Sequence, residues 1–169
     1  MASRRESFGL SQFFKILGVR AGRVQAMTSP ATSASPKLGY VIVYVPDVAK
    51  ALGFYEKAFG FERRFLHESG EYGELETGGT ALAFADERTT AAGEVFTLNR
   101  PAAKAAGAEV GIVVEDVHAA FARALREGAT PVMEPSDKPW GQTISYVRDL
   151  NGFLVELCSE VRGADPSAS

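Results

Sequence analysis

The sequence predicts an α+β fold in which two tandem βαβββ units close into an incomplete barrel around a concave cup. One observation is an order of elements that occurs twice: a β-rich run, an amphipathic helix and three short β-rich runs. Another is a repeated helix start, because Asp116-Val117 in the second half matches Asp47-Val48 in the first. One such unit cannot bury its apolar face alone, so we expect the two units to share a core.

The first unit is expected over about residues 38–86. Its opening run, Tyr40 to Val45, is rich in β-branched residues, and Asp47 is placed to cap a helix that ends at Gly60. The following strands are expected at 61–66, 73–77 and 80–85, with turns at Ser69-Gly70 and Gly78-Gly79.

The second unit is expected over about residues 108–161, after a long Ala-rich connection. Val110 to Val114 forms its first strand, and Asp116 caps a helix that Gly128 closes. The remaining strands are expected at 131–134, 143–148 and 153–159, with turns at Pro135-Ser136-Asp137 and Asn151-Gly152.

Composition limits the class of protein and its partners. A chain of 169 residues, 46% hydrophobic and 23% charged, fits one globular domain. The net charge of -3 argues against a nucleic-acid or anionic-membrane partner, because both need clustered Lys and Arg. A single cysteine, Cys158, allows no intrachain disulfide and no thiolate-rich zinc site, so a reducing compartment is expected.

The two ends of the chain differ from its middle. Residues 1–37 carry six basic residues and one acid, and four apolar residues share one helical face: Leu10, Phe13, Phe14 and Leu17. This pattern is typical of a transit peptide for a mitochondrion or plastid. The alternative is that translation starts at Met27 and the protein is cytoplasmic. Residues 162–169 are small and polar, and we expect a disordered tail there.

Two segments resemble the first and last segments of the vicinal-oxygen-chelate superfamily: YVIVYVPDVAKALGFYEKAFGF and PWGQTISYVRDLNGFLVELCS. The resemblance covers about Leu38 to Val161 and implies the βαβββ fold and a homodimer. That superfamily includes glyoxalases, dioxygenases and metal-free bleomycin-resistance proteins. The resemblance therefore predicts the fold and leaves the chemistry open.

Metal-dependent members of the superfamily place ligands on the first and last strand of each unit. By resemblance, those positions in this chain are Tyr40, Ala83, Glu109 and Glu156. Ala83 has no donor atom, so a complete metal centre is not favoured. If a divalent metal is present, Glu109 and Glu156 would hold a hard cation such as Mg²⁺ or Mn²⁺.

Glu156 is the candidate catalytic residue or metal ligand. It lies between Val155 and Leu157 in an apolar strand, where an ionised carboxylate needs a partner. The alternative is a carboxylate satisfied by Arg148 or by water in the cup. The two histidines fall outside the expected ligand positions, which excludes a His-rich centre: His67 is expected in a hairpin, and His118 on the surface.

Strand alternation places Tyr40 and Tyr44 on one face. Their rings would form aromatic walls that suit a planar or amphiphilic ligand. The alternative is that the two tyrosines only fill the interior of the barrel. Glu74 lies on an acidic strand face that is either solvated or, with Glu156, available to a cationic ligand. Trp140 at a hairpin is either a lid or part of a dimer contact. Cys158 is expected to be an inert buried thiol. The predicted cup comprises Tyr40, Tyr44, Glu74, Glu109, Trp140, Tyr146, Arg148 and Glu156.

The leading functional prediction is a bleomycin-resistance-like protein that binds a small organic molecule without a complete metal centre, as a homodimer. Two alternatives remain open. One is a metal-dependent enzyme of the same fold, a glyoxalase-like lyase or a dioxygenase. The other is a non-catalytic, stress-related protein that acts by binding partners.

Overall fold

A computed structural model describes residues 35–89 and 96–161. The two expectations for the N-terminal extension therefore concern residues that lie almost entirely outside the described part, and the expected C-terminal tail lies wholly outside it. Among the described residues, no helix is long and apolar enough to cross a bilayer.

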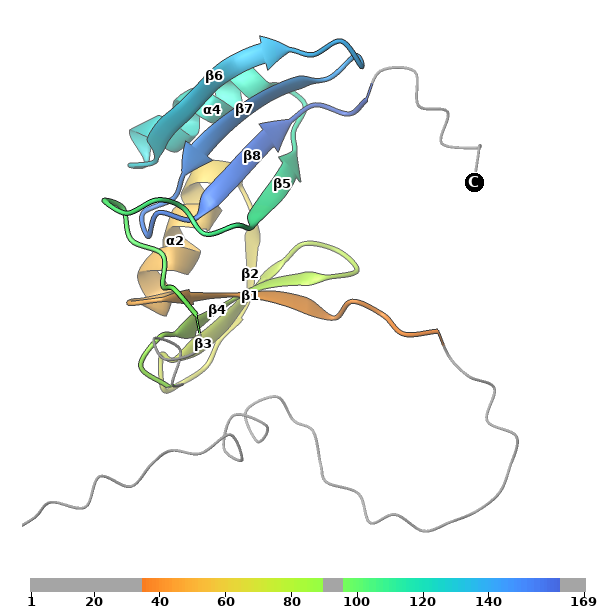
Figure 1. Cartoon of the computed structure of the whole chain (residues 1–169). Coiled ribbons are helices and arrows are strands. Elements are labelled where there is room, and N and C mark those ends of the chain that lie inside the picture. The colour runs from red at the N-terminus through yellow and green to blue at the C-terminus, as the bar shows by residue number, and fades with distance from the viewer. Residues whose placement is uncertain (1–34, 90–95, 162–169) are drawn as a thin grey trace, which may run out of the picture.

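Two βαβββ modules follow one another along the chain, as predicted (Figure 1). The first consists of β1 (Tyr40–Val45), α2 (Val48–Phe59), β2 (Glu62–Leu66), β3 (Tyr72–Glu76) and β4 (Ala81–Asp86). The second consists of β5 (Glu109–Val113), α4 (Val117–Arg126), β6 (Thr130–Asp137), β7 (Thr143–Arg148) and β8 (Leu154–Cys158).

Each module forms its own four-stranded sheet with the same topology. The strand orders are β1-β4-β3-β2 and β5-β8-β7-β6, and only the β1/β4 and β5/β8 pairs are parallel. Ile42 pairs with Ala83 in the first sheet, and Gly111 pairs with Glu156 in the second. Ala83 and Glu156 thus occupy equivalent positions, as the repeat predicts. The two sheets are not closed into a barrel.

Both helices begin where the sequence predicts. The Asp47 carboxylate accepts a hydrogen bond from the Lys50 N–H at 2.9 Å, and Asp116 accepts one from the Ala119 N–H at 2.9 Å. Each cap satisfies a backbone donor that the helix itself cannot, which stabilises the helix by about 1 kcal/mol. Gly60 ends α2 with φ of 82°, a conformation that favours glycine.

The predicted turn at Pro135-Ser136-Asp137 is wrong, because β6 continues through these residues to Asp137. The strand pairing shifts between Met133 and Ser136, so the backbone bulges there. Proline lacks the N–H that a central strand must donate, but β6 is an edge strand and a bulge tolerates it. The chain turns after β6, where the Gly141 N–H donates to the Lys138 carbonyl.

One hydrophobic core serves both modules. Helices α2 and α4 contact each other, and the apolar side chains on the helix-facing sides of both sheets join them in a single buried cluster. Fully buried members from the two modules include Leu52, Leu75, Phe84, Val147, Val155 and Leu157. The shared core that the sequence predicts is therefore present.

A buried hydrogen bond links the modules. The Tyr55 hydroxyl of α2 donates to Asp149 Oδ2 at 3.2 Å, and both residues are almost completely buried. The other oxygen of Asp149 accepts the N–H groups of Asn151 and Phe153, each at 2.8 Å, which shapes the turn between β7 and β8. Burial raises the pKa of the Asp149 carboxyl, which opposes the lowering by its hydrogen bonds.

The raised pKa of Asp149 predicts how stability depends on pH. An unfolded Asp titrates near 3.8, so above that pH the unfolded chain releases this proton before the folded chain does. Relative to Asp149→Asn, the wild type should lose free energy of unfolding as pH rises from about 3.8 through the raised pKa. Urea denaturation across this range measures the difference. Asp137→Asn, at an exposed carboxylate, is the control, and a gap that does not change with pH would contradict the prediction.

Candidate functional site

The outer face of the first sheet, away from the helices, carries two of the predicted tyrosines. In register, Tyr40 lies opposite Ala81 and Tyr44 lies opposite Ala85. The small alanines of β4 leave room above the sheet for the larger side chains of its neighbours. Tyr44 packs there against a small buried cluster that includes Tyr72.

Glu74 is buried on this face and has two partners. The Tyr72 hydroxyl donates to Glu74 Oε1 at 2.8 Å, and Arg64 Nη1 donates to Oε2 at 3.2 Å. Burial, followed by the hydrogen bond to Glu74, raises the pKa of Tyr72 well above the ordinary value, with a further contribution from Tyr40. The predicted residues Tyr40 and Glu74 therefore belong to one cluster, in which Arg64 neutralises the carboxylate. Glu74 therefore does not lie on a solvated acidic face, which was one of the two expectations for it.

Glu156 lies on the outer face of the second sheet, directly opposite Tyr146. The Tyr146 hydroxyl donates to Glu156 Oε2. This hydrogen bond is the main cause that raises the pKa of Tyr146 to about 12, and Glu109 adds to the effect. The structure thus brings Glu109, Tyr146 and Glu156 into one region. The hydrogen-bond partner of Glu156 is a phenol on the neighbouring strand.

Glu156 is approachable from the side of β5. Gly111 lies opposite it in the parallel pair, and a Cβ added at Gly111 would come within 3.9 Å of Glu156 Oε1. No side chain at position 111 covers the carboxylate. A ligand could therefore approach Glu156 over β5.

Arg148 does not partner Glu156, contrary to one of the two expectations. Its five guanidinium N–H groups donate to backbone carbonyls at distances of 2.6 to 3.2 Å. Within the described residues, no hydrogen bond or ion pair joins Arg148 to a carboxylate. The accepting carbonyls belong to Arg100, Pro101, Ala103 and Gly152.

The connection between the modules is held from both sides. Arg148 of β7 binds its carbonyls, and the Arg100 guanidinium forms a two-pronged ion pair with Glu87, just after β4, at 2.8 Å. Gly152 has φ of 86°, and a Cβ there would lie 2.5 Å from the Arg100 carbonyl oxygen. Only glycine allows this approach. Arg100 and Arg148 therefore tie residues 100–103 to both modules.

A cavity of about 320 Å³ lies between β1, this connection and the start of β5. The rings of Tyr44 and Phe96 meet in its wall, with centroids 5.0 Å apart and planes tilted by 41°. Glu109 and Phe153 also line it. Two predicted cup residues, Tyr44 and Glu109, are thus brought together. The predicted cup did not include Phe96, which lies in the connection, or Phe153, which begins the strand expected at 153–159.

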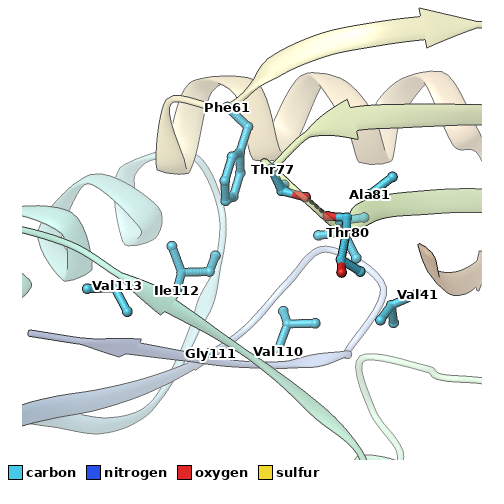
Figure 2. A pocket seen from close by; sticks show the side chains of 10 residues that line it. Val41, Phe61, Thr77, Thr80, Ala81, Val110, Gly111, Ile112 and Val113 are labelled. Atoms are coloured by element: carbon cyan, nitrogen blue, oxygen red, sulfur yellow. Dashed lines mark hydrogen bonds between the residues drawn. The ribbon is translucent and has the colours of Figure 1, made fainter. Parts of the chain in front are cut away.

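A second groove, of about 310 Å³, lies between the sheets on the other side of β1. Figure 2 shows Phe61, Val110 and Ile112 turned toward a common space, with the Thr77 hydroxyl hydrogen-bonded to the Thr80 carbonyl at its border. None of the predicted cup residues lines this groove. It is mainly apolar and has no charged side chain in its lining.

The remaining candidates lie away from the cavity between β1 and the connection. Trp140 is 56% exposed at the β6–β7 hairpin, where its Nε1–H donates to Gln142 at 3.0 Å. His67 contacts Ser69 in the β2–β3 turn, and His118 is exposed, as expected. Cys158 is buried, and burial is the main cause that raises the pKa of its thiol to about 11, which fits the expected inert cysteine.

The donor set does not fit a metal centre of the kind the superfamily uses. Ala83, the equivalent of Glu156, has no donor atom, and the strand neighbour of Glu156 on β5 is Gly111. In residues 35–89 and 96–161, no group of three or more His, Cys, Asp or Glu side chains is placed to hold a metal ion.

Two βαβββ modules with a shared core and polar clusters on their outer faces define a protein of the vicinal-oxygen-chelate class. The chain belongs to the Glyoxalase/Bleomycin resistance protein/Dioxygenase superfamily, whose family model matches residues 37–157. A comparison with curated proteins gives no match.

Many solved structures are similar to this chain. A glyoxalase-related enzyme from Fulvimarina pelagi shares 17% identity at a TM-score of 0.59, covering 73% of this chain and 87% of its own. A glyoxalase/bleomycin resistance protein/dioxygenase family enzyme from Burkholderia phytofirmans PsJN shares 19% at 0.60, covering 73% and 98%. TioX from Micromonospora sp. ML1 shares 27% at 0.55, covering 73% and 98%. These likenesses establish the fold.

Replacing Arg148 should loosen the connection. Lysine keeps the charge but has three donors in place of five and lacks the planar fork, so Arg148→Lys should lower the free energy of unfolding by about 1–2 kcal/mol. It should also speed proteolysis within residues 96–108. Urea denaturation and limited trypsin digestion measure the two effects. Arg126→Lys, at an exposed helix end, is the control, and equal behaviour of the two variants would rule out the role given to Arg148.

Cys158 should react slowly with alkylating reagents. A thiol with a pKa of about 11 is far less ionised at pH 8 than an ordinary cysteine. Alkylation of the folded protein by iodoacetamide should be about a hundredfold slower than that of free cysteine. Mass spectrometry follows the reaction, with urea-unfolded protein as the fast control. Because Glu156 contributes to the raised pKa, Glu156→Gln should increase the rate, and a native rate near that of free cysteine would contradict the assignment.

Proposed function

We propose that the protein binds a small organic molecule without a metal centre, as a bleomycin-resistance-like member of its superfamily. The observation that carries the proposal is the hydrogen bond from Tyr146 to Glu156. It supplies the partner that a half-buried carboxylate in an apolar strand needs, so Glu156 does not require a metal ion. The proposed site is the cavity lined by Tyr44, Phe96 and Glu109, together with the neighbouring face that carries Glu156.

The form of the cavity supports this proposal. Its volume of about 320 Å³ falls within the range of small-molecule sites. Its lining combines aromatic and aliphatic side chains with a few polar groups, which is the usual composition of such sites. A vestigial cup filled by its own side chains would leave no such space, so the cavity argues against the interaction-protein alternative.

A homodimer is part of the proposal. Each sheet has an edge strand beside the cavity, because β1 pairs only with β4 and β5 pairs only with β8. Several large apolar side chains are exposed in the monomer, including Val113 at 60% and Val132 at 52%. A second copy related by a two-fold axis could cover such edges and side chains.

A metal-dependent lyase or dioxygenase is the second candidate function. One observation favours it: Glu109 and Glu156 both act on Tyr146, so two carboxylates lie near one another on the second sheet. Oxygen ligands of this type suit Mg²⁺ or Mn²⁺. The two candidates differ in one measurable property, which is whether the folded protein is stabilised by a metal ion.

Metal content and thermal stability decide between them. Protein purified without an affinity tag should contain less than about a tenth of an equivalent of metal, and Mg²⁺, Mn²⁺, Zn²⁺, Ni²⁺ or Fe²⁺ should not raise its Tm, because a ligand that binds only the folded state must stabilise it. Mass spectrometry and thermal melting before and after chelation provide the measurements. Near-stoichiometric metal that is lost in Glu156→Gln, while the control Glu62→Gln retains it, would establish the metal-dependent alternative.

A further inference from the structure

We propose that the cavity between β1 and the inter-module connection takes a small aromatic molecule that carries a protonated amine, with its ring against Tyr44 and Phe96 and its ammonium group at Glu109. This inference rests on the proposed small-molecule function and adds the chemical class of the ligand. It depends on three features: an aromatic wall, an uncompensated carboxylate at one end, and a wall segment held in place before any ligand arrives.

The aromatic wall favours a planar ring. Tyr44 and Phe96 meet with their centroids 5.0 Å apart, and Phe153 and Ile42 complete the apolar surface. Phe96 is 41% exposed, so part of its ring faces water. A ligand ring placed on this surface would remove apolar area from water and would find favourable offset or edge-to-face contacts.

Glu109 gives the cavity a charge at one end. Its side chain is exposed and lines the cavity, and among the described residues no Lys, Arg or His lies within ion-pair distance of it. The two arginines that hold the connection are already engaged, Arg100 with Glu87 and Arg148 with carbonyls. A cationic ligand group can therefore approach Glu109 without displacing an existing ion pair.

The surroundings also discriminate against anions. Glu156 lies on the same sheet face as Glu109, and the Tyr146 hydroxyl on that face already donates to Glu156. A carboxylate or phosphate ligand would meet two negative charges with no arginine to receive it. An ammonium group would meet an attractive carboxylate.

The wall of the cavity is already in place. Phe96 and Asn99 belong to the connection, which Arg100 ties to the first module and Arg148 ties to the second. Because residues 100–103 are already held, a ligand has less of this segment to order on binding, and less of its binding free energy is lost to conformational entropy. The geometry thus supports binding of a small ligand that offers only one ring and one charge.

Three probes of nearly equal shape test the assignment: 2-phenylethylammonium, 2-phenylethanol and 3-phenylpropanoate. Titrations of the full chain, followed by NMR chemical shifts, should give the lowest Kd for the ammonium probe, about fivefold below that of the alcohol, with the carboxylate weakest. Glu109→Gln should bring the ammonium and alcohol probes to equal Kd without weakening the alcohol. Glu62→Gln, an exposed carboxylate outside the cavity, should leave all three unchanged.

Phe96→Ala tests the aromatic wall. It should weaken the ammonium and alcohol probes alike, and because Phe96 is partly exposed the variant should keep the wild-type Tm within a few degrees. Equal Kd values for the three probes in the wild type, or a preference for the ammonium that survives in Glu109→Gln, would overturn the inference.

The failure of the inference and of the proposed function can be told apart. If none of the three probes binds but another compound from a broad library does, and Phe96→Ala abolishes that binding, the amine assignment falls and the small-molecule function stands. If no compound from the library binds the full chain, both fall.

Discussion

Neither βαβββ unit can bury its own apolar face, and this constraint determines where the candidate site lies. Helices α2 and α4 pack together, so the helix-facing sides of both sheets are used up in one core. The Tyr55–Asp149 hydrogen bond adds a specific polar contact across that core. The polar and aromatic side chains that could bind a ligand therefore lie on the outer faces of the sheets and along the connection. Both carboxylate clusters and the cavity are found there.

The two outer faces differ in how their glutamate carboxylates are paired. Each carries a glutamate that needs a partner, and in each a tyrosine hydroxyl donates to it: Tyr72 to Glu74 and Tyr146 to Glu156. On the first face Arg64 adds a positive charge, so the carboxylate is neutralised. On the second face, no arginine of the described residues pairs with Glu156. The two pairs occupy different positions in the repeat, because Glu74 is equivalent to Tyr146 and Ala83 is equivalent to Glu156.

Most of the fold could be predicted because its signals are local. An Asp cap, a left-handed Gly60 and alternating strand residues act within a few positions, and the repeat of Asp47-Val48 as Asp116-Val117 gave the topology. The turn predicted at Pro135 was wrong because an edge strand tolerates a proline that a central strand would not. Whether a strand lies at an edge depends on the order of all the strands in the sheet, which a local pattern does not show.

The site could be predicted only in part, since its partners are distant in sequence. Glu156 was identifiable from its apolar neighbours. That its hydrogen-bond partner is Tyr146 and not Arg148 depends on the path of the connection, which lies far from both residues in sequence. Arg148 donates to carbonyls of residues 100–103 in the connection, and Phe96 of the same connection packs beside Tyr44. With Arg148 engaged by carbonyls, the carboxylates of the second face are left without its charge, and the contact of Phe96 with Tyr44 gives the cavity its aromatic wall. Those two properties together favour a cationic aromatic ligand over an anionic one.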